Sequence, residues 1–526
     1  MIKLIVVGID GANWELVNPW IEEGILPNIK KLKENGCFAD HSSCLPPVTY
    51  PNWKCYSTGK NPGKLGVFRF DHIDCNKKNF TIHNSRSFKS KEFWDYMNLS
   101  GIKAGIINMP TTYPPRKINK FLISGGPDAS ESKYRSDISK YTYPEDLEKY
   151  LEEKFDYKVH PHPYLSSKKD GEQEINSILN LIDLRFKVGI NLLEKEKVDF
   201  LQITLFYINA LQHFFWNKEP VKRAWIKIDE NIGKLLDKTD NIILMSDHGC
   251  CEIKKVFFIN RWLEKEGYLK TKKTTDDYLY SLGLSKERLL KIANTLKITN
   301  FLNKIIPESI LQIFPREEGI KGKRKLDKII WEKTIALGSN QGPIYLNMDK
   351  NSPDYEKYRN EIIKKLEEVK NPETGLKIFK KVYKAEEIYN GPYLKDAPDL
   401  MIDQKEGFHV SEGMGNGKLI SNSGNWEADN KTTGFFLAHG KDIKKDGEQP
   451  KIKILDIAPT ILHLFNVPVP EDIDGNVLKN IFKPESEPGK RDIKHKKYEK
   501  HEEKISEESE KEKELIKERL RNLGYI

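Results

Sequence analysis

The residues best suited to chemistry are Asp247 and His248, which stand side by side just after the apolar run Asn241–Met245. Such a run predicts a buried β-strand, and open α/β sheets place their sites at the carboxyl ends of such strands. An adjacent carboxylate and imidazole suit a divalent metal such as zinc. The alternative is that the pair only caps the loop after the strand.

Two further residues could complete such a site. Asp10 ends another apolar run, Leu4–Ile9, although Asp-Gly is also a strong turn signal. Thr49 follows two prolines that place it at the start of a predicted helix, where free N–H groups and the helix dipole favour an anion. A hydroxyl activated by a metal there could attack phosphorus, whereas the alternative is an ordinary N-cap.

A third segment carries Asn209 and His213, which share one face if the segment is helical because they are four residues apart. His213 lies among aromatic residues, so a satisfied core histidine is the alternative to a ligand. Later in the chain, Asn425–Gly434 is predicted to be a loop before the strand Phe435–Ala438.

Short β-branched runs alternate with helical patterns along most of the chain, which predicts an α/β fold with a mostly parallel central sheet sandwiched by helices. The predicted strands are Leu4–Ile9, Lys103–Asn108, Phe200–Thr204, Asn241–Met245, Ile344–Asn347, Leu400–Asp403 and Phe435–Ala438. The predicted helices include Pro27–Asn35, Lys91–Leu99, Pro144–Lys154, Glu172–Lys197, Ala224–Leu236, Pro353–Glu368 and Asp456–Phe465.

Two regions differ from this alternation. Residues 270–328 are rich in lysine and have amphipathic helical patches, so we expect a helical cap insertion between two parts of the catalytic core, residues 1–269 and 329–483. Residues 484–526 form a highly charged tail, either a solvated helix or partly disordered. Its last residues, 519–526, regain apolar character and could dock back.

Composition excludes several classes of protein. The chain has 526 residues and a net charge of +9, and its 38% of apolar residues suffice for a core. It has no basic stripe that would indicate a nucleic-acid polymer as partner. The six cysteines lack CxxC spacing and indicate reduced thiols. No apolar run approaches the length of about 18 residues that spans a bilayer. We therefore expect a cytoplasmic protein without a membrane partner, in an oligomeric state left open.

The order of these segments resembles the alkaline phosphatase superfamily, and within it the type I phosphodiesterase/nucleotide pyrophosphatase family. The resemblance covers residues 1–480 and implies an alkaline-phosphatase-like core, one or two divalent ions (most often zinc, with manganese or magnesium as alternatives) and a small phosphoester substrate. The motifs that carry it are Ile9–Gly11, Pro46–Pro51 with Thr58–Gly63, Gln212–Trp216, Ser246–Gly249, and Asp456–Phe465 with Val467–Gly475.

Carried over by position, the resemblance implies a complete first metal site and an altered second one. The first would be held by four residues, of which the threonine is also the catalytic nucleophile: Asp10, Thr49, Asp247 and His248. The second would be held by His213 and by an Asp and a His whose places are taken by Asn209 and Asn430. Neutral carboxamides are poor ligands for zinc, so this second site is degenerate unless Asp429 or His409 substitutes.

The family also implies an asparagine downstream of the nucleophile that contacts the phosphoryl group, and Gly66–Asp71 contains none. Lys54 or Arg69 could make that phosphate contact, or could be ordinary surface charges. The leading hypothesis is a metal-dependent hydrolase of phosphodiester or phosphoanhydride bonds that forms a phospho-threonine intermediate. The alternatives are a catalytically impaired relative that binds a phosphorylated ligand, and a sulfatase-like or phosphomutase-like activity, whose nucleophile motif Thr49 does not match.

Overall fold

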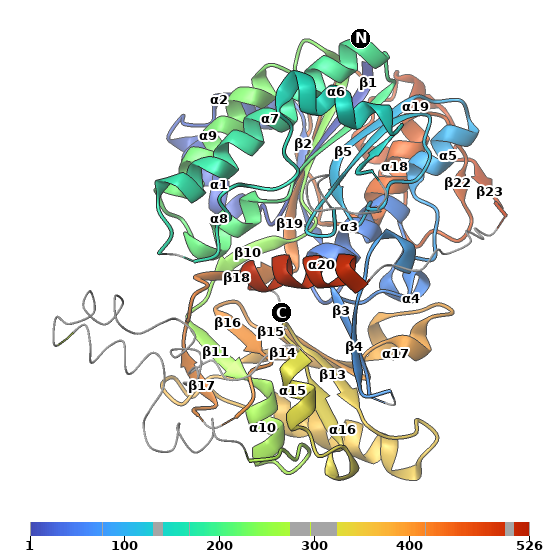
Figure 1. Ribbon diagram of the computed structural model, residues 1–526. Helices are drawn as coiled ribbons and strands as arrows, with labels where there is room; N and C mark the ends of the chain where they lie inside the picture. Colours follow the sequence, from blue (N-terminus) through green and yellow to red (C-terminus); the bar gives the residue numbers. More distant parts are fainter. Residues whose placement is uncertain are drawn as a thin grey trace.

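The computed structural model describes residues 2–75, 77–129, 140–167, 169–273, 295, 323–415, 417–499 and 510–524. These residues form two lobes, each with its own hydrophobic core (Figure 1). The larger lobe is built on a ten-stranded sheet, and the smaller lobe, below it in Figure 1, on shorter sheets.

The large sheet has a central block of parallel strands. Its order is β20-β2-β19-β9-β1-β8-β5-β6-β7, with β21 paired to β2. β1 pairs in parallel with both β8 and β9, so the first strand of the chain lies in the middle of the sheet. A parallel strand covered on both faces has no polar side, which explains the apolar run Leu4–Ile9 within β1. The strands are β1 (Ile2–Ile9), β2 (Cys37–Ser42), β5 (Ala104–Pro110), β6 (Lys120–Gly125), β7 (Thr142–Tyr143), β8 (Phe200–Leu205), β9 (Thr239–Met245), β19 (Thr433–Gly440), β20 (Gly447–Glu448) and β21 (Ile452–Lys453).

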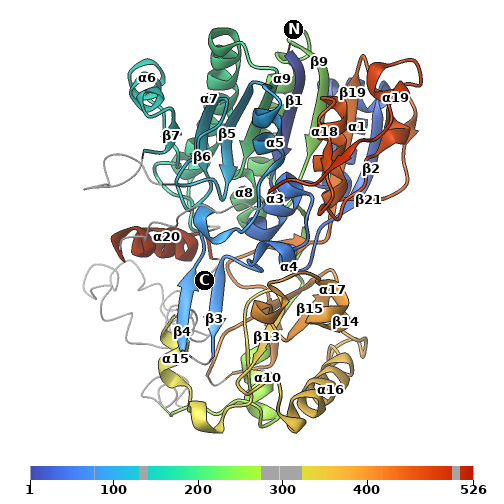
Figure 2. The ribbon, with the colours of Figure 1, turned by 90° about the vertical axis from the view of Figure 1, so that its right-hand side faces the viewer.

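Helices cover both faces of this sheet (Figure 2). α7 and α9 lie on one face, and α3, α5 and α18 lie on the other. The arrangement confirms the predicted α/β fold, and each predicted strand and helix is present with its ends shifted by a few residues. The helices of this lobe include α1 (Trp14–Glu22), α2 (Pro27–Glu34), α3 (Thr49–Thr58), α4 (Pro62–Leu65), α5 (Phe93–Leu99), α6 (Asp146–Phe155), α7 (Glu172–Glu196), α8 (Ile208–Phe214), α9 (Glu219–Gly233), α18 (Ile457–Leu464) and α19 (Glu487–Lys490).

The smaller lobe contains a four-stranded sheet in the order β12-β13-β15-β14, on which α16 (Pro353–Glu367) packs. A three-stranded sheet, β16-β11-β17, and the hairpin β3-β4 complete the lobe. Its elements are β3 (Asp71–Asp74), β4 (Asn79–Ile82), β11 (Lys255–Phe258), α10 (Ile259–Lys265), α15 (Lys323–Lys328), β12 (Ala336–Gly338), β13 (Pro343–Leu346), β14 (Phe379–Lys384), β15 (Leu400–Gln404), β16 (Phe408–Ser411) and β17 (Ile420–Asn422). Between the lobes, β10 (Gly249–Glu252) pairs with β18 (Ala428–Lys431).

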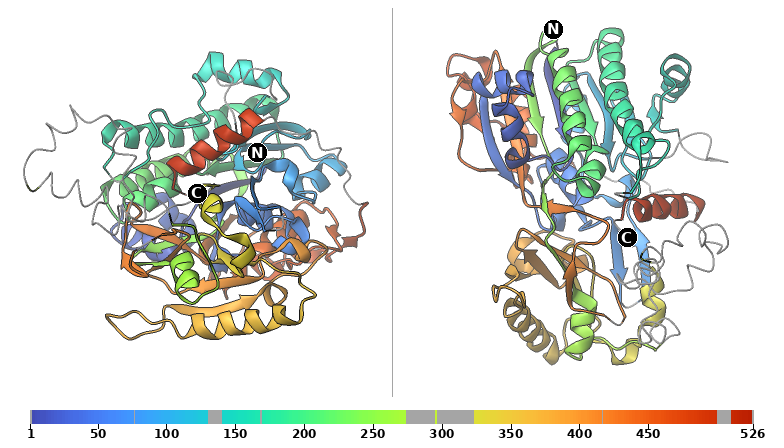
Figure 3. Two further views of the ribbon diagram at one scale, coloured as in Figure 1. Left: turned by 60° about the horizontal axis from the view of Figure 1, so that its bottom comes forward. Right: turned by 90° about the vertical axis from the view of Figure 1, so that its left-hand side faces the viewer.

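The predicted cap insertion, residues 270–328, lies mostly outside the described residues and stays a prediction. The charged tail ends in helix α20 (Glu510–Asn522), which lies between the lobes (Figures 1 and 3). Leu520 and Leu523 are buried, so the end of the tail docks back as expected. None of the described helices has the length and apolar character needed to cross a bilayer.

Candidate functional site

Asp10, Asp247 and His248 meet at the carboxyl ends of β1 and β9. These neighbouring strands are parallel, with Gly8 opposite Met245, so the residues that follow them lie side by side. His248 Nε2 lies 3.6 Å from Asp10 Oδ1 and 3.2 Å from Asp247 Oδ2. All three side chains are fully buried. The structure therefore brings together the three residues predicted from the two strand ends.

Thr49 brings a hydroxyl to the same point as the first residue of α3. Its Oγ1 lies 3.4 Å from His248 Nε2. One turn further along α3, Trp53 donates a hydrogen bond from Nε1 to Asp10 Oδ2 at 2.9 Å. Helix α3 thus supplies both the candidate nucleophile and the donor that orients the first carboxylate.

The cluster has the properties of a divalent-metal site. Two of its buried oxygens, Asp10 Oδ1 and Asp247 Oδ2, have no hydrogen-bond partner among the described residues. The nearest ligand atoms of Asp10, Asp247 and His248 all lie within 4.8 Å of one another. His248 Nδ1 faces the carbonyl oxygen of Gly249 at 3.0 Å, the outer contact that a metal-binding histidine usually makes. These donors fit a cation such as zinc.

Without a cation, burial shifts the pKa values of all three residues toward their neutral forms. Burial raises the pKa of Asp10 to about 8, although the hydrogen bond from Trp53 and the nearby hydroxyl of Thr49 lower it. Burial and the neighbouring charge of Asp10 raise the pKa of Asp247. Burial lowers the pKa of His248 to about 3, so its ring is neutral and able to ligate. A bound cation would stabilise both carboxylates in their charged forms.

A second group of side chains lies on α8, beside the first. Asn209 and His213 are one turn apart on this helix, as predicted. His213 Nδ1 donates to the carbonyl oxygen of Ala428 at 2.8 Å, and its ring stacks on Trp426 with centroids 3.9 Å apart. Gln212 Nε2 donates to the main-chain oxygen of Asp10 at 3.1 Å and so ties α8 to the first cluster.

The structure corrects the prediction that Asn425–Gly434 is a loop, because β18 occupies residues 428–431. β18 pairs antiparallel with β10, which places Asn430 opposite Cys250. The Cys250 thiol lies 3.0 Å from Asn209 Oδ1 and 3.9 Å from Asn430 Oδ1. The two asparagines therefore meet at a cysteine that follows the predicted metal motif directly.

Asp429 and His409, the possible substitutes for Asn430, pair with each other. His409 Nδ1 donates to Asp429 Oδ2 at 2.7 Å, and Gln404 and Gln341 donate to the same carboxylate at 2.6 and 3.1 Å. Although burial raises the pKa of Asp429, the charge of His409 and these hydrogen bonds hold it at about 2. Asp429 and Asn430 are successive strand residues, so their side chains point to opposite faces of β18.

Lys54 and Arg69 are buried, so the view that they are ordinary surface charges is wrong. Lys54 Nζ lies 2.6 Å from a carboxylate oxygen of Glu92. Arg69 pairs with Asp71 and donates to the carbonyl oxygen of Asn340. A phosphate contact by either residue stays a prediction.

Three residues of the site were not singled out from the sequence. Trp53 lies one helical turn after the candidate nucleophile, and Cys250 adjoins the predicted metal motif, so spacing could have indicated both. Trp426 gives no such signal, because its stacking on His213 depends on the fold. Its indole Nε1 donates to the carbonyl oxygen of Leu523 at 3.1 Å, near the end of α20.

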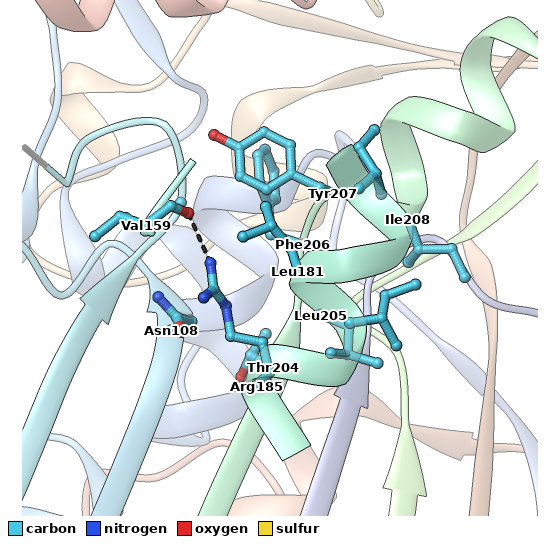
Figure 4. A pocket seen from close by; sticks show the side chains of 12 residues that line it. Asn108, Val159, Leu181, Arg185, Thr204, Leu205, Phe206, Tyr207 and Ile208 are labelled. Atoms are coloured by element: carbon cyan, nitrogen blue, oxygen red, sulfur yellow. Dashed lines mark hydrogen bonds between the residues drawn. The ribbon is translucent and has the colours of Figure 1, made fainter. Parts of the chain in front are cut away.

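Two small cavities lie next to the second group of side chains. One is a cavity of about 20 Å³ beside the start of α8, where Arg185 donates to the carbonyl oxygen of Val159 at 2.7 Å. Figure 4 shows the side chains that line it. It has room for about one water molecule and includes no residue of the metal cluster. A hollow of similar size lies next to Asn430, and Leu45 and Pro47 of the segment before Thr49 also line it.

A sheet covered by helices on both faces, with candidate metal ligands at its carboxyl edge, is the arrangement of an alkaline-phosphatase-like core. The sequence profile described as type I phosphodiesterase / nucleotide pyrophosphatase matches residues 4–442, and the chain belongs to this family. No curated protein sequence matches the chain at a significant level.

Solved structures share this fold. Phosphonoacetate hydrolase from Sinorhizobium meliloti 1021, in complex with phosphonoformate, has a TM-score of 0.54 and 14% identity, over 89% of this chain and 95% of that one. An inactive form of murine ectonucleotide pyrophosphatase / phosphodiesterase 5, in complex with AMP, has a TM-score of 0.50 and 13% identity, over 92% of this chain and 100% of that one. At these identities the likeness shows the fold alone.

Proposed function

We propose that the protein hydrolyses phosphodiester or phosphoanhydride bonds of small phosphoesters through a phospho-threonine intermediate on Thr49. Membership of the family supports the reaction class. The observation that carries the proposal is the position of Thr49 Oγ1, 3.4 Å from His248 Nε2 and beside two buried carboxylates with unpaired oxygens. A nucleophilic hydroxyl and a cation site at one point suit attack on phosphorus.

In this mechanism, Thr49 Oγ forms a bond to phosphorus while the bond from phosphorus to the leaving oxygen breaks on the opposite side. Water then attacks the phospho-threonine, which releases a phosphomonoester from a diester and restores the hydroxyl. Asp10, Thr49, Asp247 and His248 would hold a divalent cation, zinc by their donor types, which lowers the pKa of the hydroxyl and offsets phosphoryl charge. The N–H groups of the first turn of α3 add partial positive charge there.

The second group limits this activity in our proposal. His213, Asn209 and Asn430 carry no carboxylate, so these three side chains alone would hold a second cation more weakly than a site with an aspartate. We therefore expect slow turnover and a preference for good leaving groups.

We also propose a cytoplasmic setting, which the cysteines support: all six are free thiols in the structure.

Hydrolysis of bis(4-nitrophenyl) phosphate by the metal-loaded protein tests the proposal. Thr49→Ala should reduce the rate at least about 1000-fold, because removal of a nucleophile costs that much or more in enzymes with covalent intermediates. Thr49→Ser should retain part of the activity, and an acid quench should trap one phosphoryl group on residue 49. Unchanged activity in Thr49→Ala would refute the mechanism.

A second candidate function is a catalytically impaired protein that binds a phosphorylated ligand. The observation that favours it is the Cys250 thiol, which donates to Asn209 and closes the second group as a neutral cluster. The double variant Asn209→Asp with Asn430→His separates the two functions. Activity that arises only in this variant supports the binding protein, whereas little change supports the enzyme.

A further inference from the structure

We propose that the second group of side chains is a cysteine-containing metal site, in which Cys250 is the anionic ligand beside Asn209, His213 and Asn430. The site takes a borderline or soft divalent cation, such as zinc, with cobalt as a probe. The inference rests on the proposed function, because it assigns a second cation to the same catalytic centre.

The position of Cys250 follows from two strands and a helix. β10 and β18 pair so that Cys250 and Asn430 are directly opposite, where side chains on one face lie close together. From α8, Asn209 Oδ1 reaches the thiol at 3.0 Å. A Cβ atom on Gly11 would lie 2.9 Å from the same sulfur, which places the thiol against the residue that follows Asp10.

The second group needs a negatively charged ligand to hold a divalent cation, and the thiol of Cys250 can supply one. Asn209, Asn430 and the neutral imidazole of His213 offer a divalent cation no negative charge. A cysteine thiolate supplies one negative charge and a strong bond to zinc. When the sulfur–metal bond forms, the thiol proton leaves to solvent, so the cysteine replaces the charge that a carboxylate would supply.

Asn430 and His213 are the further ligands in this proposal. Asn430 is 2% exposed, and its Nδ2 has no hydrogen-bond partner among the described residues, so no second bond fixes the rotation of its amide. Its Oδ1 can therefore turn toward a cation at the thiol. His213 donates from Nδ1 to the Ala428 carbonyl at 2.8 Å, the outer contact typical of a histidine that ligates through Nε2.

The chain supplies a matched control in Cys251. It is the next residue of β10 and also buried, but its side chain lies on the opposite face of the strand, with Asp429 as its partner in the register. A serine there removes a thiol of the same exposure and leaves the second group intact.

The test is cobalt substitution of the full-length protein, with cobalt counted by elemental analysis. We expect two equivalents and a thiolate-to-cobalt charge-transfer band in the near ultraviolet. Cys250→Ser should lose the band and one equivalent, whereas Cys251→Ser should keep both. With zinc, X-ray absorption should show one sulfur at about 2.3 Å. Circular dichroism checks that each variant is folded.

The outcomes separate this inference from the proposed function. Hydrolysis with one equivalent of cobalt and no thiolate band would overturn the cysteine site and leave the enzyme intact. A band that survives in Cys250→Ser would also overturn it. A band that depends on Cys250, in a protein that hydrolyses no phosphoester, would support the site and refute the enzyme. Asp247→Asn should lose the first ion and keep the band.

Discussion

Gly11→Ala adds only one methyl group but should lower the rate of hydrolysis strongly. Gly11 has φ +72°, in the left-handed region that costs an L-residue roughly 1–2 kcal/mol. The added Cβ would lie 2.4 Å from Asn209 Oδ1 and 2.7 Å from Gln212 Nε2, so these two side chains must withdraw by about 1.0 and 0.7 Å to reach the ordinary contact distance of 3.4 Å. Gln212 holds the main chain of Asp10, and a misplacement of about 1 Å can cost about 100-fold in rate. We expect a loss of at least tenfold.

The assay is bis(4-nitrophenyl) phosphate hydrolysis together with urea unfolding. Gly24→Ala is the control, because Gly24 has nearly the same backbone conformation, φ +75°, with nothing within 4 Å of the added Cβ. Both variants should lose about 1 kcal/mol of stability from backbone strain, but only Gly11→Ala should lose activity. A folded Gly11→Ala protein with activity within threefold of the wild type would refute the reasoning.

Three further predictions concern charge. Burial raises the pKa of Asp10 to about 8, so the free energy of unfolding of the metal-free protein should fall as pH rises from 4 to 8. The increase in melting temperature on adding zinc should therefore be larger at pH 8 than at pH 6. The pKa of Asp429 is held at about 2 in the folded state, so its stabilisation of about 2 kcal/mol should disappear between pH 4 and pH 2, and urea titrations of Asp429→Asn should lack this loss. Lys54→Met removes one of the cations paired with buried Glu92 and should cost about 3 kcal/mol in urea unfolding, part of which Lys54→Met with Glu92→Leu recovers. An unchanged midpoint in Lys54→Met would contradict that estimate.

The sequence predicts the large sheet well because its central strands are buried on both faces. A run such as Leu4–Ile9 is apolar throughout, so its state depends little on distant partners. β18 was predicted as a loop for the opposite reason: its residues, Ala428–Lys431, are mostly polar, and they form a strand because β10 lies beside them. Local pattern therefore predicts the core and misses strands that depend on a partner.

The same contrast holds for the candidate site. Asp10, Asp247 and His248 follow strand ends, and parallel neighbours bring such ends together, so the first cluster could be predicted. The stacking of Trp426 on His213 could not, because it joins α8 to a segment that α20 also holds. Burial of Lys54 was missed because its partner, Glu92, is remote in sequence.

The central position of β1 also governs how the site can assemble during synthesis. β1 leaves the ribosome well before both of its neighbours, because β8 and β9 come from residues 200–245. Until those residues emerge, Asp10 has no strand beside it and Thr49 has no histidine to face. Such non-local pairing folds slowly, so the nascent chain carries its candidate nucleophile, Thr49, for a long stretch of translation before the rest of the site exists.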